Sequence, residues 1–163
     1  NAVKDIVGVQ FRNMATVGGS IWGRFGFSDV LTVFLAMDSY VELYKGGIVP
    51  LEQFAQMKKD NDILVRLIVK KTPCKVVYTA MRNQRTDFPV LACAVSSMNG
   101  EYRASIGARP ARAILIRSEK SEDFPAFVAE NAPTEGNIRG SAAYRTHLIK
   151  VLVSRCMEVL RGM

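Results

Sequence analysis

The sequence predicts an α+β protein made of two layered regions, residues 1–71 and residues 72–163. Short segments that are β-branched or that alternate between apolar and polar residues are typical of strands, and both regions contain them. A long segment with helical periodicity closes the chain. The boundary is expected at Lys70-Lys71-Thr72-Pro73, because charge and proline favour the end of regular structure there.

The first region opens with a glycine-rich stretch. Five glycines fall between residues 8 and 26, and glycine weakens helices and strands alike. We therefore expect residues 12–27 to form an ordered loop. Ser28 then offers an N-cap and Asp29 a first-turn acid, which predicts a helix to about Met37. Its side chains are almost all apolar, so the helix should be buried.

Strand and turn signals follow in the rest of the first region. Residues 41–44 alternate and predict a strand, which a turn at Gly46-Gly47 should end. Pro50 is expected to start a short helical turn. Residues 63–69 are apolar and β-branched, which predicts a second strand.

The second region is expected to hold a three-stranded antiparallel sheet packed on helices. Asn99-Gly100 marks a tight hairpin after the second of these strands. The three predicted strands are residues 75–82, 89–97 and 112–117.

Two helical segments complete the second region. Residues 118–131 should be helical in part, with an interruption near Pro125. Apolar residues recur at helical spacing from Tyr144 to Val159 and predict a helix over residues 141–161. His147 lies on the polar face of this helix, where a lone histidine is usually inert.

Composition narrows the classes of protein. The net charge of +7 is uneven, since residues 71–163 hold 14 basic and eight acidic residues. This excess favours nucleic acid, a phosphate-bearing cofactor or an acidic protein surface as partner. The best apolar segment, residues 30–37, is far shorter than the roughly 20 residues that a membrane-spanning helix needs, so we expect no membrane partner.

The three cysteines and the acidic clusters give no sign of a metal site. An odd number of cysteines without C-x-x-C spacing argues against a disulfide framework, a zinc site or an iron–sulfur site, and favours a reduced, cytoplasmic setting. Asp60-Asn61-Asp62 lacks the glycine and distal glutamate of a calcium loop. The usual catalytic motifs for nucleotide hydrolysis, Rossmann binding and acyl transfer are also absent.

One stretch could bind a ligand. Paired glycines flanked by hydroxyl residues expose several backbone N–H groups in one concavity, which attracts phosphate. Asp29, at the following helix start, could accept hydrogen bonds from sugar hydroxyls. The alternative is a glycine-rich turn in which Ser28 and Asp29 merely cap the helix. The residues of the stretch are Thr16, Val17, Gly18, Gly19 and Ser20.

Three distant segments, taken together, resemble one family. Residues 16–20 with Ser28-Asp29 resemble the second flavin-binding loop of the flavoprotein subunit of molybdenum hydroxylases, a family that includes xanthine dehydrogenase and aerobic carbon monoxide dehydrogenase. Residues 85–90 resemble a strand entry in that family's C-terminal domain, and residues 139–148 resemble the opening of its last helix. Order and spacing agree over residues 9–161.

The resemblance implies a subunit that binds FAD and serves as the exit for electrons. It places the second half of an FAD-binding domain in residues 1–71 and the flavoprotein C-terminal domain in residues 72–163. The implied partners are a molybdopterin-binding subunit and an iron–sulfur subunit, and the electrons would leave through FAD to NAD⁺ or another acceptor. No side chain need act as acid, base or nucleophile, since the cofactor performs the redox step.

The resemblance also implies site residues. Residues 16–20 would hold the FAD phosphates through main-chain N–H groups, and Asp29 would bind a sugar or ribityl hydroxyl. Leu64 matches a position that packs against the flavin, although it could equally be an ordinary core leucine. Thr79 stands where some relatives carry a lysine near the flavin, so a cationic contact is missing or comes from elsewhere. Trp22 and Phe25 could flank the cofactor, although an aromatic residue in a glycine-rich loop more often fills a core.

The start of the chain departs from the family. Nothing in residues 1–15 matches the family's first flavin loop, so we expect the chain to be the C-terminal two-thirds of a flavoprotein subunit. Half of a phosphate cradle should bind FAD weakly, and we expect the chain to purify colourless.

Two other functions are open. Residues 72–163 could be a structural module that docks subunits and has no cofactor role of its own. A nucleic-acid binder is the weaker alternative, because the basic residues are scattered and lack interleaved aromatic platforms.

Overall fold

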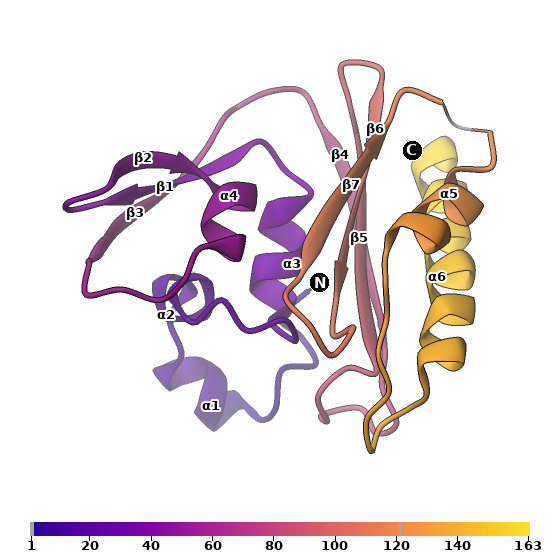
Figure 1. Cartoon of the computed structure of the whole chain (residues 1–163), viewed down its shortest axis with the longest axis horizontal. Coiled ribbons are helices and arrows are strands. Elements are labelled where there is room, and N and C mark those ends of the chain that lie inside the picture. The colour runs from indigo at the N-terminus through magenta and orange to yellow at the C-terminus, as the bar shows by residue number, and fades with distance from the viewer. Residues whose placement is uncertain (1, 121) are drawn as a thin grey trace.

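The computed structural model describes residues 2–120 and 122–163 and contains two antiparallel sheets with helices (Figure 1). The predicted α+β class is therefore confirmed. A small sheet has the strand order β2-β1-β3, and a larger one has the order β4-β5-β6-β7. The small-sheet strands are β1 (Ser39–Leu43), β2 (Gly47–Pro50) and β3 (Leu64–Val69). The large-sheet strands are β4 (Lys75–Met81), β5 (Leu91–Met98), β6 (Glu101–Gly107) and β7 (Ile114–Ser118).

Two short helices occupy the segment that was expected to be a loop. They are α1 (Val9–Met14) and α2 (Val17–Trp22), so the prediction for residues 12–27 was wrong. The glycine penalty is local and small, about 1 kcal/mol per residue, and tertiary packing overrides it here. Ile21 is completely buried in the core of the small sheet, and the Thr16 side chain caps α2.

Helix α3 (Asp29–Leu35) confirms the predicted buried helix. The Ser28 hydroxyl accepts a hydrogen bond from the Leu31 amide at 3.2 Å, as its position predicted. Helix α3 lies between the two sheets and contacts β5 and β6, while its apolar residues join the core of the small sheet. It is therefore the element that links residues 1–71 to the large sheet.

The small sheet has one strand that the sequence did not indicate. Gly47 begins β2, which pairs with β1, whereas a turn and a helical turn were expected between Gly46 and Phe54. The four residues of β2 are mostly exposed, so they lack the apolar alternation of a half-buried strand. Helix α4 (Leu51–Gln56) then starts directly after Pro50, as expected.

The large sheet has four strands, so the count of three was wrong. The extra strand is β6, which forms the predicted hairpin with β5 through Asn99 and Gly100. Both turn residues have positive φ, 52° and 81°, which the primed turns of two-residue hairpins require. Apart from Tyr102 and Ile106, β6 consists of small and charged residues, so its strand propensity is weak.

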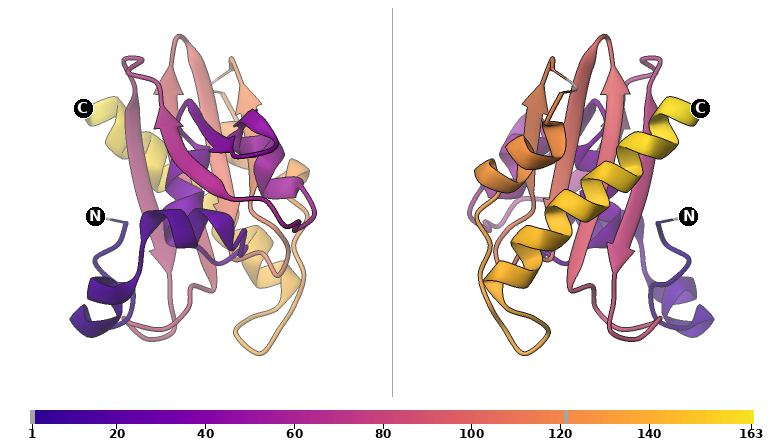
Figure 2. Two further views of the ribbon diagram at one scale, coloured as in Figure 1. Left: turned by 90° about the vertical axis from the view of Figure 1, so that its left-hand side faces the viewer. Right: turned by 90° about the vertical axis from the view of Figure 1, so that its right-hand side faces the viewer.

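Two helices cover the outer face of the large sheet. Helices α5 (Phe124–Asn131) and α6 (Ala142–Gly162) pack there, with α6 running diagonally across the strands (Figure 2). The final helix is confirmed, and Pro125 lies in the first turn of α5, where it begins the helix and does not interrupt it. With α3 on the other face, the sheet is the middle of three layers. Among the described residues, no helix is long and apolar enough to cross a membrane.

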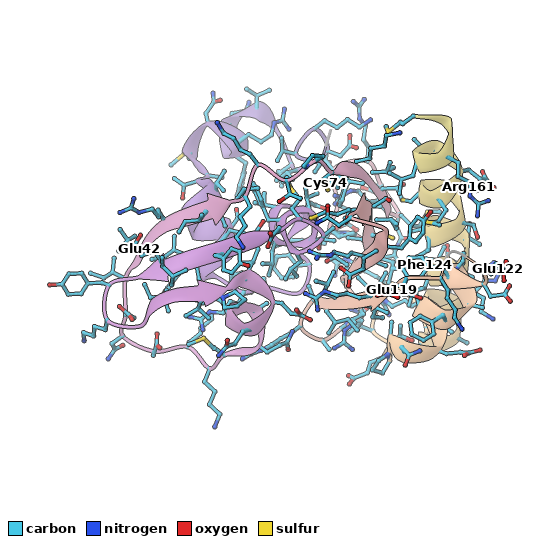
Figure 3. The ribbon with its side chains drawn as sticks, turned by 90° about the horizontal axis from the view of Figure 1, so that it is seen from above. Glu42, Cys74, Glu119, Glu122, Phe124 and Arg161 are labelled. Atoms are coloured by element: carbon cyan, nitrogen blue, oxygen red, sulfur yellow. The ribbon has the colours of Figure 1, made fainter. Side chains whose placement is uncertain are left out.

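Several charged side chains lie at the periphery of the molecule. Seen from above, Glu42 of β1 and Arg161 of α6 lie at opposite ends of the molecule, with Cys74 between them (Figure 3). Glu119 and Glu122 are exposed, which agrees with a solvated face.

Candidate functional site

The amino terminus of α2 presents unpaired backbone donors. The Thr16 hydroxyl accepts from the Gly19 amide at 2.9 Å, and the Thr16 carbonyl accepts from the Ser20 amide at 3.1 Å. The amides of Val17 and Gly18 make no hydrogen bond to any residue that the structure describes. A helix start with free N–H groups and little side-chain cover favours an anion such as phosphate. The predicted concave nest is thus a capped helix start with two free donors.

A cavity of about 410 Å³ adjoins this helix start. It brings together Gly18, Gly19 and Leu64, which are far apart in the sequence. A Cβ added to Gly18 would lie 3.8 Å from Leu64 Cδ2, so the glycine leaves the surface beside Leu64 bare. Trp22 also lines this cavity. Leu64 is half-buried at the start of β3 and packs against the core of the small sheet, so both of its predicted roles remain compatible with its position.

Asp62 forms the far side of the same cavity and holds its turn in place. Its carboxylate accepts hydrogen bonds from the amides of Lys45 and Gly46, both at 2.9 Å, and from that of Ile63 at 2.7 Å. Burial alone would raise the pKa of Asp62, but these three donors outweigh it and lower the pKa. The carboxylate therefore stays charged and ties the β1–β2 turn to β3.

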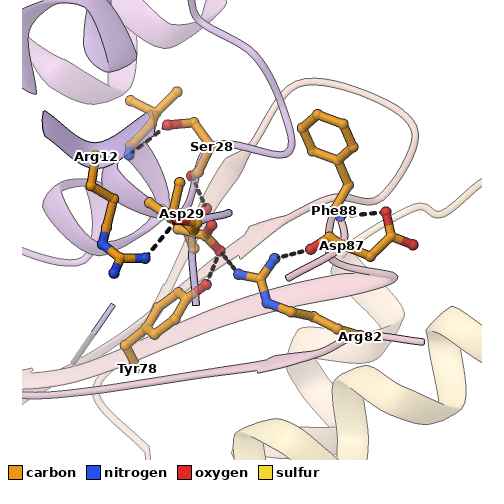
Figure 4. A network of polar contacts seen from close by, with 10 residues as sticks. Arg12, Ser28, Asp29, Tyr78, Arg82, Asp87 and Phe88 are labelled. Carbon is orange, nitrogen blue, oxygen red and sulfur yellow. Dashed lines mark hydrogen bonds and ion pairs between the residues drawn. The ribbon is translucent and has the colours of Figure 1, made fainter. Parts of the chain in front are cut away.

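A second cavity, of about 210 Å³, brings Ser20 and Asp29 together. The Asp29 carboxylate lies in a polar network with two residues of the large sheet region (Figure 4). Its Oδ1 accepts from Arg82 Nη2 at 2.6 Å and from the Tyr78 hydroxyl. The side chains of Asp29 and Arg82 are only 7% and 8% exposed, so this ion pair is largely removed from water. Arg82 also donates to the Asp87 carbonyl at 2.6 Å, which fixes the loop after β4.

The network keeps Arg82 charged and Tyr78 protonated. Burial, followed by the nearby Asp29 charge, raises the pKa of Tyr78 far above its ordinary value. Burial alone would lower the pKa of Arg82, but its hydrogen bond and attraction to Asp29 raise it overall. Both protein donors use Oδ1 of Asp29, so this residue joins α3 to β4 in addition to lining the cavity.

Thr79 lies apart from the other predicted site residues. It belongs to β4 and lines a different cavity, of about 390 Å³, together with Asp5 and Arg85. The structure therefore groups Gly18, Gly19 and Leu64 at one cavity, Ser20 and Asp29 at a second, and Thr79 at a third.

Sequence reasoning missed Tyr78 and Arg82 as partners of Asp29. They are 49 and 53 residues away from it along the chain, so no local motif joins them. Their spacing of four residues places them on one face of an extended segment, which was the only signal available. No group of three or more His, Cys, Asp or Glu in the described part of the chain could hold a metal ion.

Comparison with known proteins identifies the first region. Residues 1–71 match a family model described as the FAD binding domain in molybdopterin dehydrogenase. The uncharacterized protein YgfM of Escherichia coli K12 is 24% identical over 164 residues, which cover 94% of this chain and 62% of that protein. The chain thus spans less than two thirds of the length of this curated relative.

Solved structures share the fold over nearly the whole chain. Quinoline 2-oxidoreductase from Pseudomonas putida 86 has a TM-score of 0.78 at 19% identity, and the match covers 99% of this chain and 66% of that one. Carbon monoxide dehydrogenase from Hydrogenophaga pseudoflava has a TM-score of 0.76 at 19% identity, with coverage of 96% and 64%. The enzyme from Oligotropha carboxidovorans gives 0.77 at 17%, with coverage of 94% and 63%.

At sequence identities of 17–19%, the likeness to the solved structures shows the fold alone. The family model that matches residues 1–71 names the cofactor. FAD is the cofactor that residues 1–71 imply. The donor set agrees with a phosphate, because the free amides of Val17 and Gly18 stand beside the Thr16 and Ser20 hydroxyls on an exposed helix start. Residues 1–71 therefore match the FAD-binding domain of the molybdopterin dehydrogenase family, and the resemblance to the flavoprotein subunit of molybdenum hydroxylases is confirmed.

Proposed function

We propose that the chain is the FAD-binding component of a molybdenum hydroxylase, which passes electrons from iron–sulfur clusters through FAD to NAD⁺ or another acceptor. The observation that carries this proposal is the capped start of α2, with free amides at Val17 and Gly18, inside the segment that matches the FAD-binding family. Bound FAD would supply the redox chemistry, and the residues of this chain would hold and orient it.

The residues divide this binding task between two cavities. The amides of Val17 and Gly18 would hold phosphate oxygens, since α2 directs its unpaired donors outward there. Leu64 lines the same cavity and is not covered by a side chain at Gly18, so it would pack against the flavin there. Asp29 would accept a sugar or ribityl hydroxyl from the cavity that it shares with Ser20, held in place by Tyr78 and Arg82.

The partners belong to the same proposal. A molybdopterin-binding subunit would hydroxylate the substrate, and an iron–sulfur subunit would relay the electrons to this chain. Residues 72–163 would form the flavoprotein C-terminal domain, with the boundary at Lys70–Pro73. Three free thiols, at Cys74, Cys93 and Cys156, favour a reducing cytoplasmic setting.

A proline at position 17 tests the proposal sharply. Val17 is the first residue of α2, where proline is well tolerated, and Thr16 already has the extended backbone (φ −117°, ψ 151°) that precedes proline. Val17→Pro removes one free N–H donor and leaves the helix intact. We expect the affinity for FAD to fall about tenfold, the effect of losing one charge-assisted hydrogen bond. Quenching of the only tryptophan, Trp22, which lines the cavity, reports the titration.

Val17→Ala is the matched control, because it removes the same side chain and keeps the amide. It should bind FAD like the unchanged chain, and both variants should melt at nearly the same temperature. Equal affinity of Val17→Pro and Val17→Ala for FAD would contradict a role for this amide. If the unchanged chain itself does not bind FAD at millimolar concentration, the protein is better described as a subunit-docking module without its own cofactor.

A further inference from the structure

A cavity of about 450 Å³ lies where the loop before α3 meets the connection between β6 and β7. Its lining combines arginines with exposed aromatic rings and includes no carboxylate. The flavin proposal uses none of these side chains. The six that matter are Arg24, Arg112, Arg139, Phe25, Phe27 and Phe88.

Arg24 is the most unusual of them. It is only 5% exposed, and no carboxylate in the described part of the chain forms an ion pair with it. Its guanidinium is covered by two rings, with Cζ 4.9 Å from the centroid of Trp22 and 4.2 Å from that of Phe54. These rings stabilise the buried cation and leave only its edges for hydrogen bonds.

One edge of this guanidinium is unused. Nε donates to the Trp22 carbonyl at 3.3 Å, and Nη1 donates to the carbonyls of Met57 and Lys58 at 3.2 and 2.9 Å. Nη2 is buried and has no hydrogen-bond partner among the described residues. A buried unpaired donor is costly and calls for an explanation, which a ligand in the adjoining cavity supplies.

The other two arginines add charge to the same cavity. Arg139 pairs through Nη2 with Asp87 at 3.2 Å, but its Nε is buried without a partner among the described residues. Arg112 Nη1 donates to the Met57 carbonyl at 2.6 Å and faces no carboxylate within ion-pair distance in the described residues. Two arginines that each carry an unpaired nitrogen thus line one space, which favours an anion.

The aromatic wall indicates what the anion is attached to. Phe27 stacks on Phe25 with centroids 5.2 Å apart and an interplanar angle of 12°, and it meets the edge of Phe88 at 4.6 Å. The three rings are 41–50% exposed, so the wall offers apolar faces and edges to a further ring. Cations flank the wall at both ends, with Lys59 Nζ 4.6 Å from the Phe25 ring and Arg139 Cζ 5.3 Å from the Phe88 ring.

We infer that this cavity binds a small planar anion, an aromatic ring that carries a carboxylate or a phosphate. The acid group would accept hydrogen bonds from Arg24 Nη2 and Arg139 Nε, and the ring would lie against Phe27. The amides proposed to hold the FAD phosphates, at Val17 and Gly18, do not line this cavity, so the two binding sites can be tested with different variants.

Isothermal titration calorimetry of the unchanged chain with four probes tests the inference. Benzoate and phenyl phosphate share a ring and differ in the acid group, so the tighter of the two identifies the group that the cavity prefers. Inorganic phosphate lacks the ring and benzyl alcohol lacks the charge, and both should bind at least about tenfold more weakly. If neither benzoate nor phenyl phosphate binds at millimolar concentration, or if inorganic phosphate binds as tightly as phenyl phosphate, the inference is wrong.

Two variants place the binding in this cavity. Arg139→Gln and Phe27→Leu should each weaken the better probe about tenfold. Arg155→Gln on the exposed surface of α6 and Phe127→Leu, whose ring is 41% exposed like that of Phe27, are the matched controls and should leave binding unchanged. Equal affinity of all four variants would place the ligand elsewhere.

Arg24 is better observed than replaced, since its loss from between two rings would unfold the chain. In ¹H–¹⁵N spectra, the guanidinium signals of Arg24 and Arg139 should shift on titration, while those of Arg155 stay in place. The same shifts should appear in Val17→Pro, which separates this site from the FAD proposal. A titration that moves Arg155 as much as Arg24 would indicate general charge screening and contradict the site.

Discussion

Each region of the chain buries an arginine, and the two differ in how fully the protein satisfies them. Arg145, in α6, is completely buried and donates to four acceptors. They include the Val90 carbonyl at 2.9 Å and the Glu135 carbonyl at 2.8 Å. Arg24, beside α2, is almost as buried but leaves Nη2 without a partner. The hydrogen bonds of Arg145 are all made within the protein, whereas Arg24 keeps one donor that a ligand could use.

The difference in hydrogen bonding between Arg145 and Arg24 follows from the helices and strands that surround each residue. Arg145 joins the 21-residue helix α6 to the residue just before β5 and to the segment before α6, so its bonds hold the large sheet and its cover together. Arg24 follows a six-residue helix and contacts a loop. Residues 72–163 therefore serve as the rigid platform, and the unpaired donors near α2 lie on the part that is available to ligands.

The largest expected effect comes from removing the satisfied arginine. Arg145→Met keeps most of the volume but removes four hydrogen bonds, including the buried one to the Val90 carbonyl, and we expect it to lower the free energy of unfolding by about 3–5 kcal/mol. Urea unfolding measures the change. Arg155→Met, on the exposed side of the same helix, is the control and should stay within about 0.5 kcal/mol. Similar midpoints for the two variants would show that Arg145 does not hold the platform together.

A smaller effect is expected where the two regions meet. Asp29→Asn keeps an oxygen for Tyr78 and Arg82 but removes the charge that opposes the buried guanidinium, which should cost about 2 kcal/mol. Tyr78→Phe deletes only the hydroxyl and should cost about 1 kcal/mol. If Asp29→Asn is as stable as the unchanged chain, the ion pair does not contribute to joining α3 and β4.

The smallest effect concerns pH and the small sheet. The three amide donors lower the pKa of Asp62, so its contribution to stability is complete above its ordinary pKa of 3.8 and is lost as the pH falls through the lower value of the folded state. Hydrogen exchange between about pH 5 and pH 2 should show the amides of Lys45 and Gly46 opening before those of the large sheet. Asp62→Asn should remove this dependence, whereas exposed Glu158→Gln on α6 should not.

The sequence predicted the elements whose signals are local. The spacing of Leu148 and Leu152 gave α6, Ser28 gave the cap of α3, and Asn99-Gly100 gave the hairpin. The missed elements, α1, α2, β2 and β6, lack such local signals: α2 contains a glycine pair, and β2 is too short and too exposed to show an alternating pattern.

The candidate site shows the same limit. The glycine pair and its hydroxyl neighbours were visible as a candidate phosphate-binding stretch, and the family resemblance pointed to Leu64, which lies at the same cavity as the glycines. Nothing local linked Asp29 to Arg82, or Arg24 to the carbonyls after α4, because these contacts bridge 53 and 34 residues. Only the fold could bring such residues together.

The wall of Phe25, Phe27 and Phe88 also lines the smaller cavity that holds Asp29. The same rings thus line two compartments, and a ligand that displaces a ring on one side would change the space on the other. Occupants of the two sides would compete for shared volume, and each would weaken its neighbour's binding by the same factor.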